Sequence, residues 1–160
     1  RQRQMCIRDR PRPWRVNQGA ILVVENSESH YQQQGTTLEA WREFVRQKLK
    51  SQTDQLIVFR PKNLDRKTRD NLYEHLCHSD YYCVITDASA AAIEAVWAGI
   101  PIITLGQHIS VPVARNNLAN INDLYRGPIG DWLCALTYSQ WTLAEMQSGL
   151  AVKMIRRYHA

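Results

Sequence analysis

Four short runs of apolar residues recur along the chain, each bounded by polar residues or proline. They are residues 20–24, 55–59, 83–86 and 101–105 (AILVV, QLIVF, CVIT and PIITL). Continuous apolar runs of this length, rich in valine and isoleucine, are typical of strands buried on both faces of a parallel sheet. We therefore predict four strands, the last of which opens with a proline at a position that strands tolerate.

Between these runs the apolar positions are spaced by three and four residues, which indicates helices. Helices are predicted over residues 36–51, 65–79, 88–98 and 129–138 and from residue 142 onward. Thr36 with Glu39, and Thr142 with Glu145, have the capping-box pattern, and Gly99 is expected to close the third helix. The alternation predicts a three-layer Rossmann-like α/β domain with a mainly parallel sheet and a helical C-terminal extension. Gly149 is expected to weaken that last helix.

The net charge of +5 is confined to the start of the chain. Residues 1–15 hold six arginines and one aspartate, whereas residues 16–160 hold equal numbers of basic and acidic residues. The predicted domain is thus neutral and lacks the basic stripe typical of nucleic-acid binders. We expect no nucleic-acid partner.

Residues 5–10 (MCIRDR) match one reading frame of a transposon end that is used in sequencing libraries. We interpret residues 1–13 as a non-native or disordered basic leader. Residues 14–160 are then the domain, and we expect it to be a fragment of a longer protein from which a preceding domain is missing.

Three cysteines lie outside this leader: Cys77, Cys83 and Cys134. Their odd number and the lack of a CxxC pair argue against a disulfide framework and favour a cytoplasmic protein. His75 and His78 flank the first cysteine, but no second ligand pair follows at zinc-site spacing, so no metal is predicted. The apolar stretch 82–105 is interrupted by charged residues, glycine and proline, so no integral membrane segment is expected.

Ligands of open parallel sheets bind beyond the carboxyl ends of the strands. Arg60 and Lys62 follow the second predicted strand across a proline, and two cations held in this way suit a phosphate. The alternative is a solvated surface pair.

A second candidate follows the third strand. The small residues Ser89 and Ala90 open a helix there, where free backbone N–H groups suit phosphate. The alternative is that Asp87 or Ser89 simply caps the helix. Glu94 lies about two turns after Asp87 on the same helix face, and its carboxylate suits a ribose diol; the alternative is a helix-surface glutamate.

Residues 86–103 (TDASAAAIEAVWAGIPII) resemble the strand–helix–strand element of the C-terminal, donor-nucleotide half of GT-B glycosyltransferases. Residues 60–62 (RPK) are similar to the basic element of transferases that act in capsular polysaccharide and Kdo-type pathways. Residues 136–145 (LTYSQWTLAE) resemble the closing segment of glycosyltransferases of bacteria and phages. The likeness spans roughly residues 18–150.

The resemblance implies glycosyl transfer from a nucleotide sugar to a saccharide acceptor in surface polysaccharide synthesis. It implies these roles: donor phosphate for Arg60, Lys62, Ser89 and Ala90, ribose for Glu94, and a site loop for Thr86, Asp87 and His108. It calls for no metal and no cofactor, since the nucleotide sugar is a substrate, and it leaves the catalytic residues unassigned. It also allows peripheral contact with a membrane.

Two alternatives stay open beside this interpretation. One is a GT-B sugar-nucleotide epimerase or polyol-phosphate transferase, for which His30 and His108 are the loop histidines. The other is a non-catalytic Rossmann-like module that binds a nucleotide or a partner protein. Thr86 stands where retaining GT-B enzymes often carry a second glutamate, so the stereochemical outcome stays open as well.

Overall fold

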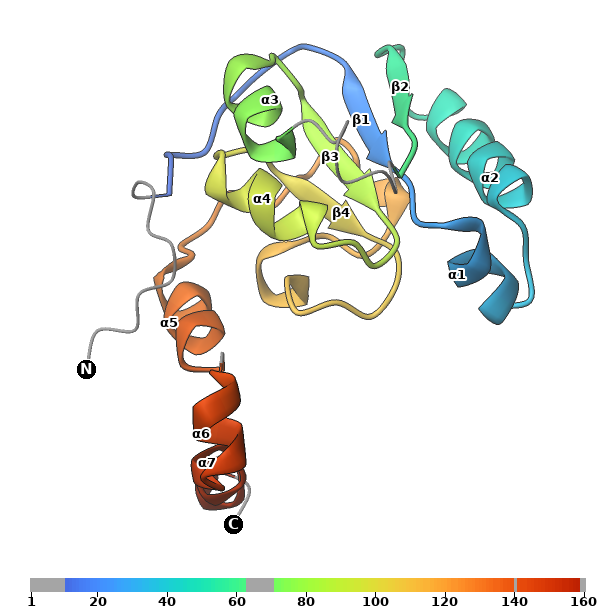
Figure 1. The fold of residues 1–160 in the computed structure, drawn as a ribbon. Helices are drawn as coiled ribbons and strands as arrows, with labels where there is room; N and C mark the ends of the chain where they lie inside the picture. The colour runs from blue at the N-terminus through green and yellow to red at the C-terminus, as the bar shows by residue number, and fades with distance from the viewer. Residues whose placement is uncertain (1–10, 63–70, 140, 159–160) are drawn as a thin grey trace. The chain divides into compact units, whose positions relative to one another are not determined.

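In this computed structural model, which describes residues 11–62, 71–139 and 141–158, four strands form one sheet (Figure 1). The strands are β1 (Ile21–Val24), β2 (Ile57–Arg60), β3 (Cys83–Thr86) and β4 (Ile102–Thr104). Their order is β2-β1-β3-β4, and every neighbouring pair is parallel. The four predicted strands are therefore confirmed, with ends that move by one or two residues.

The helices of this domain are α1 (Glu28–Gln33), α2 (Leu38–Lys50), α3 (Leu72–His78) and α4 (Ala91–Trp97). Two 3-10 turns follow β4, at Val111–Val113 and Leu118–Asn120. The predicted start of the helix at residue 65 lies outside the described residues. The third predicted helix is shorter than expected, because it begins at Ala91 and not at residue 88. Gly99 follows it with φ +76°, as expected of a left-handed C-cap.

Helix α1 and the start of α2 differ from the sequence prediction. Residues 28–33 are not among the predicted helices, but they form a helix whose buried residue is Tyr31. Thr37, and not Thr36, caps α2, because its side chain accepts the Ala40 N–H at 3.1 Å. Thr36 still belongs to the turn that closes α1, where its N–H donates to the Tyr31 carbonyl.

Both faces of the sheet are covered. On one face, Ile21, Val23 and Ile85 pack with Trp41 and Val45 of α2 in a single apolar cluster. On the other face, the alternate residues of β1, β3 and β4 are buried as well, and α4 packs on β3 and β4 with α3 beside it, as expected for strands between two helical layers. The domain is thus a three-layer Rossmann-like α/β domain.

The chain divides into two compact units, residues 9–128 and a unit that includes residues 129–158. The second unit is the expected helical extension, with α5 (Gly130–Tyr138), α6 (Leu143–Gln147) and α7 (Leu150–Tyr158). Thr142 and Glu145 form the predicted capping box. Gly149 has φ +73° and separates α6 from α7, so the single weakened helix expected here is wrong. Within the described part of the chain, no helix is long and apolar enough to cross a membrane.

Candidate functional site

Four residues at the strand ends form a row across the sheet. Val24 pairs with both Arg60 and Thr86, and Thr86 pairs with Thr104. Register partners in a parallel sheet share a face, and the residues before them face α2. The row therefore lies on the side of α3 and α4, at the carboxyl edge of the sheet where open α/β folds bind ligands.

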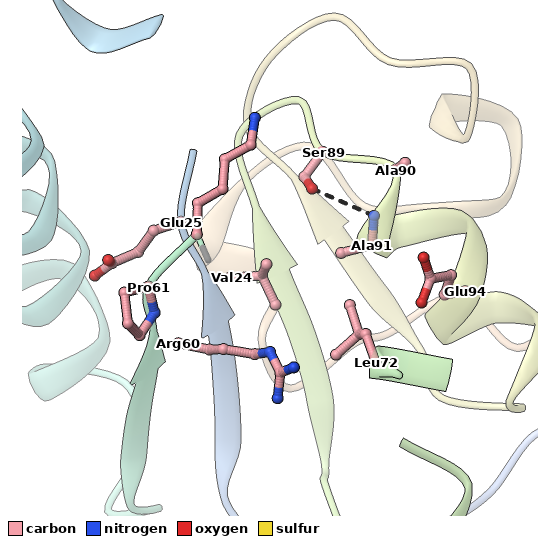
Figure 2. A pocket seen from close by; sticks show the side chains of 10 residues that line it. Val24, Glu25, Arg60, Pro61, Leu72, Ser89, Ala90, Ala91 and Glu94 are labelled. Atoms are coloured by element: carbon pink, nitrogen blue, oxygen red, sulfur yellow. Dashed lines mark hydrogen bonds between the residues drawn. The ribbon is translucent and has the colours of Figure 1, made fainter. Parts of the chain in front are cut away.

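A pocket of about 360 Å³ opens at the β2 and β1 end of this row (Figure 2). It is lined by Val24, Glu25, Arg60, Pro61, Lys62, Leu72, Ser89, Ala90, Ala91 and Glu94. The structure thus brings together all five residues that the sequence singled out for phosphate and ribose.

Separate elements supply these side chains. Arg60 ends β2 and Lys62 follows it across Pro61, while Glu94 lies in the first turn of α4. In Figure 2, Arg60 and Glu94 approach the hollow from opposite sides, with Leu72 of α3 between them. The pocket therefore presents cations on the β2 side and a carboxylate on the α4 side.

The turn before α4 gives the pocket a hydroxyl and a close-approach surface. The Ser89 Oγ accepts the Ala91 N–H at 3.3 Å, which is a long bond (Figure 2). Ala90 is exposed and has no side chain beyond its methyl group. Because α4 has only seven residues, we assign little of the pocket's polarity to a helix dipole.

Sequence reasoning missed an ion pair on the pocket wall. Glu25 follows β1 and is 1% exposed, and its carboxylate accepts from Nε and a terminal nitrogen of Arg42 at 2.5 and 2.8 Å. The hydrogen bonds that Arg42 donates to Glu25 raise the pKa of the Arg42 guanidinium. The pair joins residues 17 positions apart in different elements, so no local pattern could have revealed it.

The expected site loop is not part of the pocket. Asp87 faces α1, where its Oδ2 lies 2.6 Å from Nε2 of His30 and accepts from Gln34 at 3.0 Å. It does not cap α4, whose N-cap residue is Ala90. Thr86 is fully buried, and its hydroxyl has no hydrogen-bond partner among the described residues. These contacts turn the loop away from the phosphate candidates.

His108 also lies outside the pocket. Its Nδ1 is 2.6 Å from the Ser110 Oγ in the segment after β4, and burial lowers the pKa of the imidazole. Among the described residues, no group of three or more His, Cys, Asp or Glu side chains is placed to hold a metal ion.

The fold and the pocket define a Rossmann-like α/β domain with a charged hollow at the carboxyl edge of its sheet. No family model matches the chain, and a search of the curated proteins finds no significant match.

Proposed function

We propose that this pocket binds the diphosphate and ribose of a nucleotide sugar, and that the chain is the donor half of a glycosyltransferase of surface polysaccharide synthesis. The observation that carries the proposal is the convergence of Arg60, Lys62, Ser89 and Glu94 on one hollow. Its volume of about 360 Å³ lies within the range of small-molecule sites.

The charge of the pocket wall supports an anionic ligand. Arg42 balances the buried carboxylate of Glu25, so this acid adds no net charge to the wall. Among the described residues that line the pocket, the cations Arg60 and Lys62 then outnumber the remaining carboxylate, Glu94. Guanidinium and ammonium groups on a short turn are a common phosphate-binding arrangement.

The chemistry of transfer requires stabilisation of the departing nucleotide. The bond between the anomeric carbon and the diphosphate oxygen breaks, and the electron pair goes to that oxygen. The oxygen of an acceptor hydroxyl forms the new bond to the anomeric carbon and releases its proton to water. Arg60 and Lys62 stabilise the negative charge that develops on the diphosphate. Glu94 accepts a hydrogen bond from a ribose hydroxyl and so orients the donor.

Calorimetric titration with UDP, GDP and their sugar conjugates tests the proposal. We expect micromolar to millimolar binding that Arg60→Ala weakens by about 1–3 kcal/mol, the usual contribution of a charge-assisted hydrogen bond. Lys50→Ala is the matched control, because it removes an exposed cation at the end of α2 outside the pocket. Absence of binding to every nucleotide, or equal losses in the two variants, would overturn the proposal.

A further inference from the structure

A second hollow, of about 590 Å³, lies between α2 and the segment that follows β4. It is lined by Trp41, Phe44, Lys48, Gln52, Asp87, Leu105, Asn116, Asn117, Leu118 and Ala119. We call it the α2 groove. None of these residues lines the first pocket, which contains Arg60, Lys62 and Glu94 and which we call the charged pocket. The two hollows are therefore separate.

Aromatic and aliphatic side chains form the apolar part of the α2 groove. Trp41 and Leu118 belong to the buried core, which fixes their positions. Phe44, one turn further along α2, is 47% exposed. An exposed ring beside a buried one offers a flat apolar surface that a ligand can cover.

The polar part of the α2 groove is dominated by amides. Gln52, Asn116 and Asn117 each combine a donor and an acceptor in one planar group. The Asn117 Oδ1 accepts the Ala119 N–H at 2.9 Å, which holds that amide in place. The backbone carbonyl of Gln52, just after α2, accepts from the side-chain amide of Asn122 at 3.2 Å, which joins this end of α2 to the segment that follows β4.

Among the described residues that line the α2 groove, the formal charges balance. Lys48 is the cation of its lining and Asp87 is the carboxylate, and Asp87 is already held by His30 and Gln34. A balanced lining gives a phosphate no electrostatic advantage, in contrast to the cationic charged pocket. The ligand that fits is uncharged, has many hydroxyls and has an apolar face.

We propose that the α2 groove binds a neutral oligosaccharide. The C–H face of a pyranose ring covers Phe44, and its hydroxyls exchange hydrogen bonds with Asn116, Asn117 and Gln52. Each hydroxyl both donates and accepts, as the amides do, so the pairing leaves few polar groups unsatisfied. The inference is independent of nucleotide binding in the charged pocket.

Titration of the ¹⁵N-labelled chain with neutral trisaccharides tests this inference, using maltotriose, cellotriose and triacetylchitotriose. We expect millimolar or tighter binding to at least one of them, with shifts in the amide signals of Asn116, Asn117 and Gln52. Phe44→Ala and Asn116→Ala are expected to weaken it about tenfold each, whereas Phe44→Trp retains it. Leu56→Ala, which removes another exposed apolar side chain outside the groove, is expected to change nothing.

Arg60→Ala separates this inference from the proposed function, because it alters nucleotide binding and leaves saccharide binding intact. Lack of response to all three saccharides would overturn the inference. So would binding that survives both Phe44→Ala and Asn116→Ala, since the ligand would then lie elsewhere. Concentration-dependent shifts of the same signals without any sugar would assign the groove to a second copy of the chain.

Discussion

The carboxylate of Glu25 accepts two hydrogen bonds from the guanidinium of Arg42, at 2.5 and 2.8 Å. The carboxylate is fully buried, whereas the Arg42 side chain is 28% exposed. The backbone of Glu25 is also held in place, because its N–H donates to the Arg60 carbonyl at 3.1 Å. The pair therefore links α2 to the ends of β1 and β2, beside the charged pocket.

Arg42→Met is expected to lower the free energy of unfolding by about 2–4 kcal/mol, because it leaves a buried carboxylate without its partner. Urea denaturation at neutral pH measures the change. Arg46→Met is the control on the same helix, and its exposed ion pairs are expected to contribute less than about 1 kcal/mol. Equal losses in the two variants would show that burial of Glu25 does not matter.

The raised pKa of Tyr31 predicts that the fold loses stability at alkaline pH. Burial raises the pKa of its phenol from 10.0 to about 12, and its oxygen accepts the Asn26 N–H at 3.2 Å. A raised pKa in the folded state means that unfolding favours ionisation. The contribution of Tyr31 to stability is therefore complete below pH 10 and is lost as the pH rises toward about 12.

Urea midpoints measured across this pH range test the Tyr31 prediction. Tyr31→Phe removes the ionisable group, so its stability is expected to fall less steeply than that of the natural chain over the same interval. The variant also loses the acceptor of the Asn26 N–H, at a cost of about 1–2 kcal/mol at neutral pH. Parallel pH profiles for the two proteins would contradict the prediction.

Gly99 and Gly35 form a matched pair for a test of packing. Both have positive φ, at +76° and +75°. A Cβ on Gly99 would lie 2.2 Å from the Pro13 carbonyl oxygen, whereas a Cβ on Gly35 would meet nothing within 4 Å. The backbone strain of an alanine is thus the same at the two positions, and the steric conflict is not.

Gly35→Ala is expected to destabilise the fold by about 1 kcal/mol, and Gly99→Ala by a further 1–3 kcal/mol, measured by thermal or urea unfolding. The same comparison tests whether residues 11–13, which we interpreted as part of a leader, pack against the domain at Gly99. Residues 1–10 of that leader lie outside the described residues. Arg12 donates its N–H to the Trp97 carbonyl at 3.0 Å, next to Gly99. Equal effects of the two alanines would show that Pro13 does not pack there.

Glu94→Gln is expected to weaken binding of a ribonucleoside diphosphate by about 1–2 kcal/mol, because an amide oxygen accepts a hydroxyl less strongly than a carboxylate does. A 2′,3′-dideoxy analogue lacks the proposed donors, so it is expected to bind both proteins alike. Calorimetry with the two ligands and the two proteins gives the coupling free energy between Glu94 and the ribose hydroxyls directly. A loss of equal size for both ligands would reject the ribose role of Glu94.

The apolar runs determined the sheet and, through it, the place of the charged pocket. A strand buried on both faces needs continuous apolar side chains, and parallel strands end at the same edge. These two constraints placed Arg60 at the same edge of the sheet as the start of the helix that carries Glu94, whereas the ribose role of Glu94 was an implication of the family resemblance. Helix α1 was not predicted from the sequence because it is short, mostly exposed and polar, and its one buried residue, Tyr31, gives no periodic pattern.

Only the tertiary structure decided which polar side chains meet. His30 and Asp87 are 57 positions apart, and their contact depends on how α1 turns back over the end of β3. Thr36 and Thr37 are chemically equal as caps, and the turn through Gly35 selects the second. Periodicity records whether a side chain faces the core, whereas a hydrogen bond between distant residues depends on the packing of whole elements, which no local pattern encodes.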